Sequence, residues 1–285
     1  MPTLAIETGI EPEYEQRLME SAWTAGWDVV EVRHIPFTTL FILAPNGEHG
    51  NPISDEFRDN TDVWLNGSIQ AAKGAQAGTK WKVHAPWNEL RCSRYYLKLA
   101  DRLLQKDHTF ATLAELPRAK DQLYATSGLA EDGTLFIRPD GNDKVFTGGC
   151  ISLDDWDHGF KLMTFYEPPP ETRVVVARPR RISAEARFLV VGGKLVTGSY
   201  YKTGGQSVRL EASDDLMAIA DDFLAFCLER GFNPSPSWVL DLAETAEGWH
   251  IIEVGATSCC GLYQCDTDKF VTALTEVLPK EKGNE

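Results

Sequence analysis

Two acidic residues, Asp241 and Glu253, lie in two apolar segments whose pattern is typical of the strands of one β-hairpin. If the chain turns through residues 246–248, with Gly248 in the left-handed conformation, Asp241 falls opposite Glu253 on the same face. Like charges opposed across a ladder destabilise it, and an Asp inside a strand is disfavoured. A divalent cation held between the two carboxylates would remove this conflict, so the pair predicts a metal site.

A different turn gives a different interpretation of the same hairpin. With a two-residue turn at Glu247 and Gly248, the register slips by one residue and the carboxylates of Asp241 and Glu253 lie on opposite faces. The segment would then be a solvated surface hairpin without a metal. The hairpin alone favours neither interpretation, and the charged residues elsewhere in the chain decide between them.

Positively charged residues follow the end of a strand predicted for residues 134–138. Arg138 ends the segment TLFIR, and Lys144 lies in the polar, glycine-ended loop that comes next. Either residue alone is more simply explained as a surface cation paired with a carboxylate. Together with a metal-binding carboxylate pair, they are what a triphosphate requires, because the metal neutralises charge while Arg and Lys hold the oxygens.

A second predicted hairpin, residues 186–201, adds more charged residues. Its turn at Gly192 and Gly193 is a favoured two-residue type. This turn places Glu185 and Arg187 on one face, which Lys202 reaches from the returning strand. Such a face suits a polyphosphate.

These residues must be positioned by two kinds of structure. Residues 1–110 alternate short apolar strands with helices, which indicates an open α/β domain. Residues 111–285 interleave strands and hairpins with single helices, which indicates an α+β domain with a central part at 111–175 and a C-terminal part at 176–285. The expected elements of the first part are strands at 4–6, 28–32 and 62–67, a helix at 13–25 and a helix capped by Ser93.

Composition narrows the class of protein. The 285 residues are 43% hydrophobic and 25% charged, as in an ordinary globular protein. The net charge of −14 argues against a nucleic-acid partner. No apolar run is long enough to span a membrane and no signal-peptide pattern opens the chain, so we expect a cytoplasmic protein without a membrane partner. The six cysteines and six histidines lack zinc-ligand spacing.

The order of these elements resembles the ATP-grasp superfamily, closest to its compact bacterial and phage-type members, over residues 112–278. The resemblance implies an N-terminal α/β domain followed by two α+β halves that clasp ATP. It also implies that the loop at residues 141–149 closes over the phosphates. Fold, cofactors and residue roles then follow from the family's pattern.

The resemblance assigns a role to each charged residue. Asp241 and Glu253 match the two magnesium-binding carboxylates, and Arg138 and Lys144 match the groups that grip the α- and β-phosphates. Arg187 and Lys202 match the catalytic cations at the γ-phosphate. The residues that match the nucleotide-binding linker strand and the charged start of the next strand are Val176, Ala177, Arg178 and Glu185.

One position departs from the family's pattern. The metal motif usually ends with an Asn two residues after the Glu, and here that position is Gly255. Glycine offers no side-chain oxygen. The second metal would then be bound more weakly, or by Ser258, Asp266 or oxygens of the substrate.

The resemblance implies an ATP- and Mg²⁺-dependent ligase that joins a carboxylate to an amine through an acyl-phosphate, with small-molecule or peptide substrates. Three alternatives stay open. The protein could be a phosphotransferase that uses the same site, or a nucleotide-binding module with little or no catalysis, as Gly255 suggests. It could also be a plain α/β binding protein whose charges form surface salt bridges.

Overall fold

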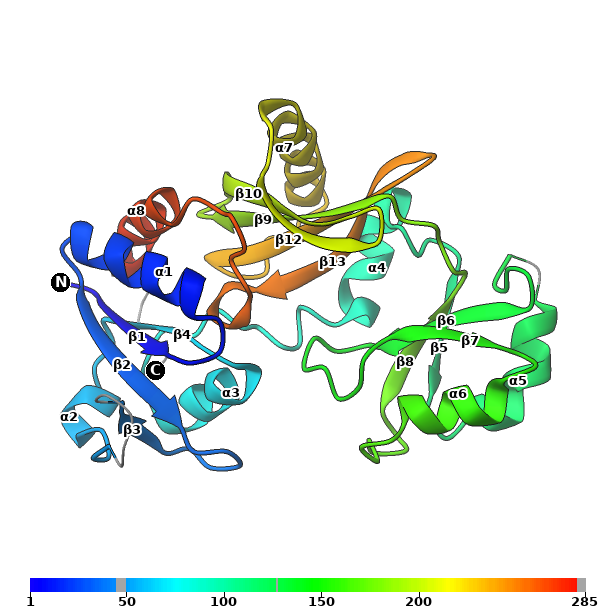
Figure 1. Cartoon of the computed structure of the whole chain (residues 1–285), viewed down its shortest axis with the longest axis horizontal. Helices are drawn as coiled ribbons and strands as arrows, with labels where there is room; N and C mark the ends of the chain where they lie inside the picture. Colours follow the sequence, from blue (N-terminus) through cyan, green and yellow to red (C-terminus); the bar gives the residue numbers. More distant parts are fainter. Residues whose placement is uncertain (45–49, 127, 281–285) are drawn as a thin grey trace.

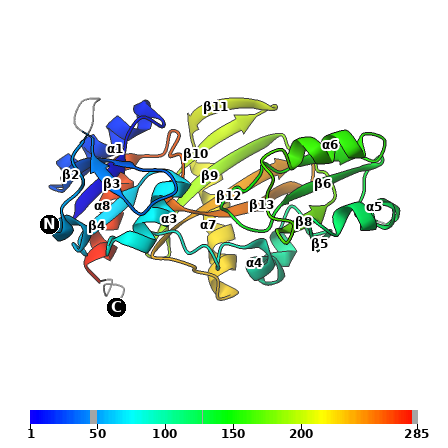
Figure 2. The same cartoon turned by 90° about the horizontal axis from the view of Figure 1, so that it is seen from below.

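The computed structural model describes residues 1–44, 50–126 and 128–280 and contains three β-sheets (Figures 1 and 2). The first sheet has the order β3-β2-β1-β4, in which β1, β2 and β4 are parallel and β3 is antiparallel. Its strands are β1 (Thr3–Glu7), β2 (Asp28–His34), β3 (Phe41–Leu43) and β4 (Val63–Asn66). The helices of this part are α1 (Pro12–Thr24), α2 (Asp55–Arg58) and α3 (Ile69–Gly78).

The second sheet is antiparallel, with the order β5-β8-β6-β7. Its strands are β5 (His108–Thr112), β6 (Thr134–Pro139), β7 (Gly149–Ser152) and β8 (Arg173–Ala177). Two helices, α5 (Leu116–Ala125) and α6 (Trp156–Met163), pack on it through a core that includes Leu116, Trp156 and Val174. This sheet with its two helices lies at the opposite end of the molecule from the first sheet (Figure 1).

The third sheet lies between the other two and is also antiparallel, with the order β11-β10-β9-β12-β13 (Figure 2). Its strands are β9 (Ala184–Val191), β10 (Lys194–Thr203), β11 (Gln206–Glu211), β12 (Ser237–Thr245) and β13 (Gly248–Ala256). Helix α7 (Asp214–Glu229) begins at a Ser213 cap, whose hydroxyl accepts from the Leu216 amide, and buries Leu216, Ala220 and Phe223. The shorter helices are α4 (Cys92–Leu99) and the 3₁₀ turns η1 (Ala100–Arg102), η2 (Thr257–Cys259) and η3 (Leu278–Lys280).

The last helix, α8 (Thr267–Val277), returns to the first sheet and lies beside α1 (Figure 1). Phe270 and Leu274 of α8 share a buried cluster with Leu18 of α1 and Trp64 of β4. The two ends of the chain therefore form one core. None of the helices in the described ranges combines the length and apolar character that crossing a bilayer demands.

Several local predictions need correction. Ser93 does not cap its helix, because α4 begins at Cys92 and the Ser93 amide and hydroxyl both donate to the Asp140 carboxylate. Helix α4 buries Tyr95 and Tyr96, whereas its Leu97 is 88% exposed. The strands β3, β5 and β11 were not expected, and each lies at the edge of its sheet.

Candidate active site

The β12–β13 hairpin places Asp241 directly opposite Glu253, as one of the two interpretations of the sequence requires. The turn itself is different from both expectations. Thr245 pairs with Gly248, so only Ala246 and Glu247 form the loop. This register alone would pair Asp241 with Ile252. A bulge at Ile252 shifts the ladder by one residue and returns Glu253 to the face of Asp241.

Each of the two carboxylates is bound by its own arginine. Arg187 lies opposite Asp241 on β9, and its Nε and Nη2 donate to the two Asp241 oxygens at 2.9 and 2.8 Å. Arg138, at the end of β6, donates from Nη2 to Glu253 Oε1 at 2.7 Å. The Arg187–Asp241 pair is a bidentate fork within one sheet. The Arg138–Glu253 pair connects the second sheet to the third.

Burial and charge shift the pKa values of these carboxyl groups in opposite directions. Burial raises the pKa of Asp241 above its usual value; Arg187 opposes the shift without cancelling it, and the neighbouring Glu253 charge adds to it. Burial would also raise the pKa of Glu253, but Arg138, Arg187 and Lys144 together lower it. Burial alone would lower the pKa of Arg187, yet attraction to Asp241 raises it well above its ordinary value.

Two cavities lie next to each other beside the paired carboxylates and arginines. The larger, about 370 Å³, is lined by Arg138, Glu185 and Glu253 together with apolar residues. The smaller, about 180 Å³, is lined by Arg187, Asp241 and Glu253. Lys144 and Glu253 line both. Further residues of the larger cavity are Gln105, Phe136, Phe146, Tyr201 and Ile252, and the N-terminal part contributes Glu11, Ile69 and Trp87 to the smaller.

The polar loop at residues 141–149 is attached to two other parts of the molecule. The Asn142 side-chain amide donates to the Val254 carbonyl on β13. Asp143 accepts from the Lys73 ammonium of α3 at 3.1 Å. Gly148 lies so close to Arg138 that a Cβ there would be 2.8 Å from the Arg138 Cβ. The loop is therefore docked beside both cavities.

The structure brings six of the predicted site residues to the two cavities, namely Arg138, Lys144, Glu185, Arg187, Asp241 and Glu253. Lys202 lines neither cavity; its ammonium contacts Glu185 Oε1 at 3.0 Å and its side chain is 46% exposed.

The three residues that match the nucleotide-binding linker strand line neither of the two cavities. Val176 and Ala177 are fully buried in β8, which pairs with β5 on one side and β6 on the other. Arg178 forms an ion pair with Glu131 at 3.2 Å and lines a separate cavity with Arg180. This geometry gives their predicted roles no direct support.

Sequence reasoning missed two tyrosines beside Arg187. The rings of Tyr201 and Tyr263 stack with centroids 5.1 Å apart, and the Arg187 guanidinium lies 5.6 and 5.2 Å from them. The Tyr201 hydroxyl donates to Glu185 at 2.8 Å. Strict alternation places Tyr201 on the face away from Lys202, but the β10 register shifts between Tyr200 and Lys202, and no signal in the sequence marks that bulge.

The donor set fits a magnesium ion bound mainly by its substrate. The described residues contain no group of three or more His, Cys, Asp or Glu side chains able to hold a metal. Mg²⁺ commonly takes one or two carboxylates, several waters and phosphate oxygens. Asp241 and Glu253 supply that number of carboxylates, and a cation between them would relieve the repulsion that contributes to the raised pKa of Asp241.

The other two proposed oxygen donors are engaged elsewhere. The buried Ser258 hydroxyl accepts from the His84 amide at 2.9 Å. Asp266 caps α8 by accepting from the Lys269 amide. Neither residue lines the two cavities.

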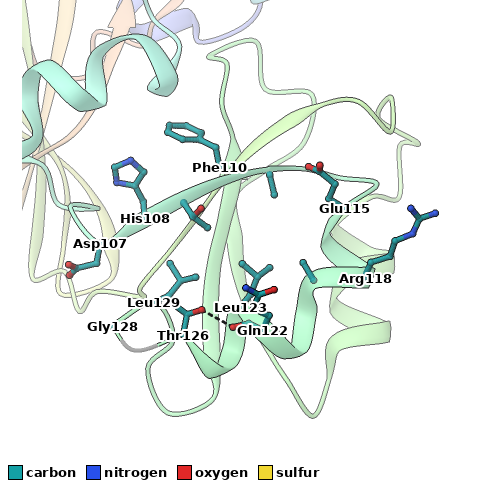
Figure 3. A pocket seen from close by; sticks show the side chains of 13 residues that line it. Asp107, His108, Phe110, Glu115, Arg118, Gln122, Leu123, Thr126, Gly128 and Leu129 are labelled. Atoms are coloured by element: carbon teal, nitrogen blue, oxygen red, sulfur yellow. Dashed lines mark hydrogen bonds between the residues drawn. The ribbon is translucent and has the colours of Figure 1, made fainter.

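A larger cavity, about 680 Å³, lies between β5 and α5 (Figure 3). Its lining includes one Lys or Arg side chain, Arg118, which extends outward (Figure 3), while Glu115 accepts from the Thr112 amide at the end of β5. None of the predicted site residues lines it. Charge and predicted residues gather instead at the two smaller cavities.

Comparison with known proteins identifies the family and the fold. The sequence model of one ATP-grasp domain family, family 3 of its clade, matches residues 68–274. The chain belongs to this ATP-grasp family. The expected fold class, an N-terminal α/β part followed by an α+β ATP-grasp fold, is confirmed. The boundary predicted at residue 110 stays a prediction.

Solved structures share the fold over nearly the whole chain. A crystal structure of D-cycloserine synthetase DcsG matches with a TM-score of 0.63 and 14% identity, covering 97% of this chain and 99% of that one. D-alanyl-alanine synthetase A from Vibrio cholerae matches with a TM-score of 0.58 and 12% identity, covering 99% of each chain. The ATP-grasp ligase PsnB, complexed with a minimal precursor, matches with a TM-score of 0.54 and 11% identity, covering 97% and 99%. No curated protein sequence matches.

Proposed function

We propose that this protein is an ATP- and Mg²⁺-dependent ligase that joins a carboxylate to an amine through an acyl-phosphate. The observation that carries the proposal is the meeting of two cavities at Glu253 and Lys144, with Asp241, Arg138 and Arg187 around the junction. ATP-grasp proteins with the same fold include two named synthetases and a named ligase, which supports this class of reaction.

The cavity of about 370 Å³, lined by Arg138 and Lys144, is the proposed nucleotide site. Phe136, Phe146 and Ile252 provide apolar surface for a base, while Arg138 and Lys144 lie where phosphates would reach the junction. The planar guanidinium of Arg138 suits phosphate oxygens, and Lys144 adds a point charge. Val176, Ala177 and Arg178 keep a proposed role only if the base reaches the end of β8.

The two carboxylates are the proposed magnesium ligands. Asp241 and Glu253 would hold the ion, which when bound neutralises phosphate charge. Arg138 and Arg187 contact these carboxylates in the structure, so they are close enough to share the phosphate oxygens. Glu185 fixes the Tyr201 hydroxyl and the Lys202 ammonium at the edge of the nucleotide cavity.

The smaller cavity is the proposed place of the acceptor carboxylate. An oxygen of this carboxylate attacks the γ-phosphorus while the bond to the ADP oxygen breaks. An amine then attacks the acyl carbon, inorganic phosphate leaves, and the amine loses its proton. Arg187, with Lys202 in support, would stabilise charge on the transferring phosphoryl group, so catalysis is mostly positioning and charge neutralisation.

The test is ADP release with a panel of acid and amine pairs, with products identified by mass spectrometry. The ligase proposal expects an amide, ADP and phosphate in equal amounts, all lost in the Asp241→Asn, Glu253→Gln double variant. A stable phosphorylated acid or alcohol would instead show a phosphotransferase. Tight binding of ATP without turnover of any acid would identify a binding module and overturn the ligase.

A further inference from the structure

Gly255 lacks a side chain at a position beside the two carboxylates, and Asn142 lies next to that position. Gly255 lies two residues after Glu253 and lines the smaller cavity. A Cβ built at Gly255 would lie 3.4 Å from the Val239 Cβ and 3.8 Å from the Asn142 Nδ2. The side-chain amide of Asn142 therefore lies in van der Waals contact with the place where a side chain at position 255 would begin.

The hydrogen bond of Asn142 fixes which end of its amide is engaged. Its Nδ2 donates to the carbonyl of Val254, the residue between Glu253 and Gly255. An amide has a separate carbonyl oxygen with two lone pairs, which this bond does not use. Asn142 lines the same cavity as Asp241, Glu253 and Lys144.

We propose that Asn142 supplies the amide oxygen of the metal site from the loop at residues 141–149, in place of a side chain at Gly255. The inference rests on the proposed function, because it needs a divalent cation at Asp241 and Glu253. Mg²⁺ and Mn²⁺ accept neutral carbonyl oxygens beside carboxylates. Ser258 and Asp266, the other residues considered for this role, are occupied elsewhere.

Because Asn142 lies in the loop at residues 141–149, binding of a metal by its oxygen would also affect how this loop docks. Asn142 contacts β13, Asp143 contacts Lys73 on α3, and Lys144 lines both cavities. Because these three residues are consecutive, a cation that binds Asn142 also favours the docked position of Lys144. Metal and nucleotide then strengthen each other's binding, and this coupling is reciprocal.

The experiment measures the Kd of a non-hydrolysable ATP analogue on the full chain by calorimetry, once with Mn²⁺ and once with EDTA. The ratio of the two Kd values is the gain due to the metal. We expect Asn142→Ala to reduce this gain by about tenfold, the lower end of what lost support of a metal site costs. Its Kd in EDTA reports separately the cost of losing the hydrogen bond to Val254, and the ratio removes that cost from the metal gain.

Two further variants separate the oxygen of Asn142 from its N–H donor. Asn142→Asp keeps an oxygen ligand and removes the donor to Val254, so it should retain the full metal gain. Gly255→Asn in the Asn142→Ala background should restore most of the gain, because it places an amide at the same location. Circular dichroism and the unfolding midpoint confirm that each variant is folded.

The outcomes separate this inference from the proposed function. A metal gain in Asn142→Ala within twofold of the native value, or Asn142→Asp as weak as Asn142→Ala, overturns the role of the Asn142 oxygen and leaves the ligase standing. Failure of Gly255→Asn to restore the gain counts against it as well. A native protein that does not bind the analogue overturns the nucleotide site and this inference together.

Discussion

Asp241 and Glu253 face each other across β12 and β13, yet the pKa values of their carboxyl groups move in opposite directions. Both are buried, and burial disfavours a charged carboxylate. The attraction of Arg138 to Glu253, aided by Arg187 and Lys144, outweighs burial, whereas Arg187 alone does not outweigh it at Asp241. Asp241 is therefore the carboxylate that gains most from a bound cation.

The Arg187–Asp241 pair predicts a large effect on stability. Arg187→Ala leaves Asp241, which is 2% exposed, without its two hydrogen bonds. Breaking a buried pair from one side costs about 3–5 kcal/mol, and we expect a loss of that size for Arg187→Ala. Urea unfolding at neutral pH measures this loss, and adding Asp241→Asn to Arg187→Ala should recover part of it.

An exposed ion pair provides the control for this prediction. Lys106 lies 3.9 Å from Glu247, and both side chains are more than half exposed. Lys106→Ala should change the free energy of unfolding by less than about 0.5 kcal/mol. An Arg187→Ala variant no less stable than Lys106→Ala would contradict the view that Asp241 depends on Arg187.

Two neighbouring glycines make a matched test of loop docking. A Cβ at Gly148 would lie 2.8 Å from the Arg138 Cβ and 3.2 Å from the Ile137 carbonyl, whereas a Cβ at Gly149 meets nothing within 4 Å. Gly148→Ala must displace the loop or Arg138, and overpacking of this kind costs about 1–3 kcal/mol. We expect the affinity for an ATP analogue to fall about tenfold, equivalent to about 1.4 kcal/mol.

Gly149→Ala is the control, and its affinity for the analogue should stay within twofold of the native value. Calorimetric titration of both variants decides the matter. Equal affinities would show that the close approach of Gly148 to Arg138 does not position the phosphate-binding groups.

The sequence predicted the carboxylate pair but not how the chain achieves it. Two charged residues at opposed positions are visible in the sequence, whereas the bulge at Ile252 breaks the alternation of the strand without a local signal. Tyr201 was missed for the same reason, because a bulge reverses the side to which a strand residue points. A pattern with a period of two cannot reveal where that period breaks.

Contacts between segments that are far apart in the chain could not be predicted from the sequence either. Asn142, Lys73 and Glu11 come from three separate elements, and only the fold brings them to one junction. The ion pair of Arg178 with Glu131 is another contact that the family's pattern does not reveal. The fold class could be predicted because it depends on the order of elements, which tolerates errors in single contacts.

The Lys73–Asp143 contact predicts a salt-dependent effect on nucleotide release. The two side chains are about one third exposed, at 39% and 34%, and Lys73 also lies 5.6 Å from the centre of the Trp87 ring. Pairs of this kind are worth about 0.2–1 kcal/mol, so Lys73→Met should speed dissociation of a fluorescent ATP analogue by at most about fivefold. Its effect on overall stability should be small.

Stopped-flow measurements at two salt concentrations test this prediction. The difference between native protein and Lys73→Met should be clear at about 0.01 M salt and largely vanish at about 1 M, where charges are screened within about 3 Å. Lys80→Met is the control, because Lys80 pairs with Asp59 at 3.6 Å through more exposed side chains. Similar rates for native protein and Lys73→Met at low salt would show that the loop docks without α3.

Asp266 predicts a pH-dependent contribution to stability. It caps α8, with Oδ1 accepting from the Lys269 amide at 3.0 Å. Burial would raise the pKa of Asp266, but the hydrogen bonds and charge of Lys269 outweigh burial and lower it. Removing an N-cap side chain costs about 1 kcal/mol, so Asp266→Ala should lose about that much at neutral pH.

The sign of the pH effect follows from this lowered pKa. Because the folded-state value lies below the ordinary value of 3.8, the charged cap stabilises the protein fully above 3.8 and loses that contribution as the pH falls through the folded-state pKa. The gap in unfolding midpoint between native protein and Asp266→Ala should therefore narrow under acid. Asp266→Asn keeps an uncharged acceptor, so its gap from Asp266→Ala should not change with pH. If the difference in unfolding midpoint between native protein and Asp266→Ala stays constant down to strongly acid pH, the charge of Asp266 contributes nothing to capping α8.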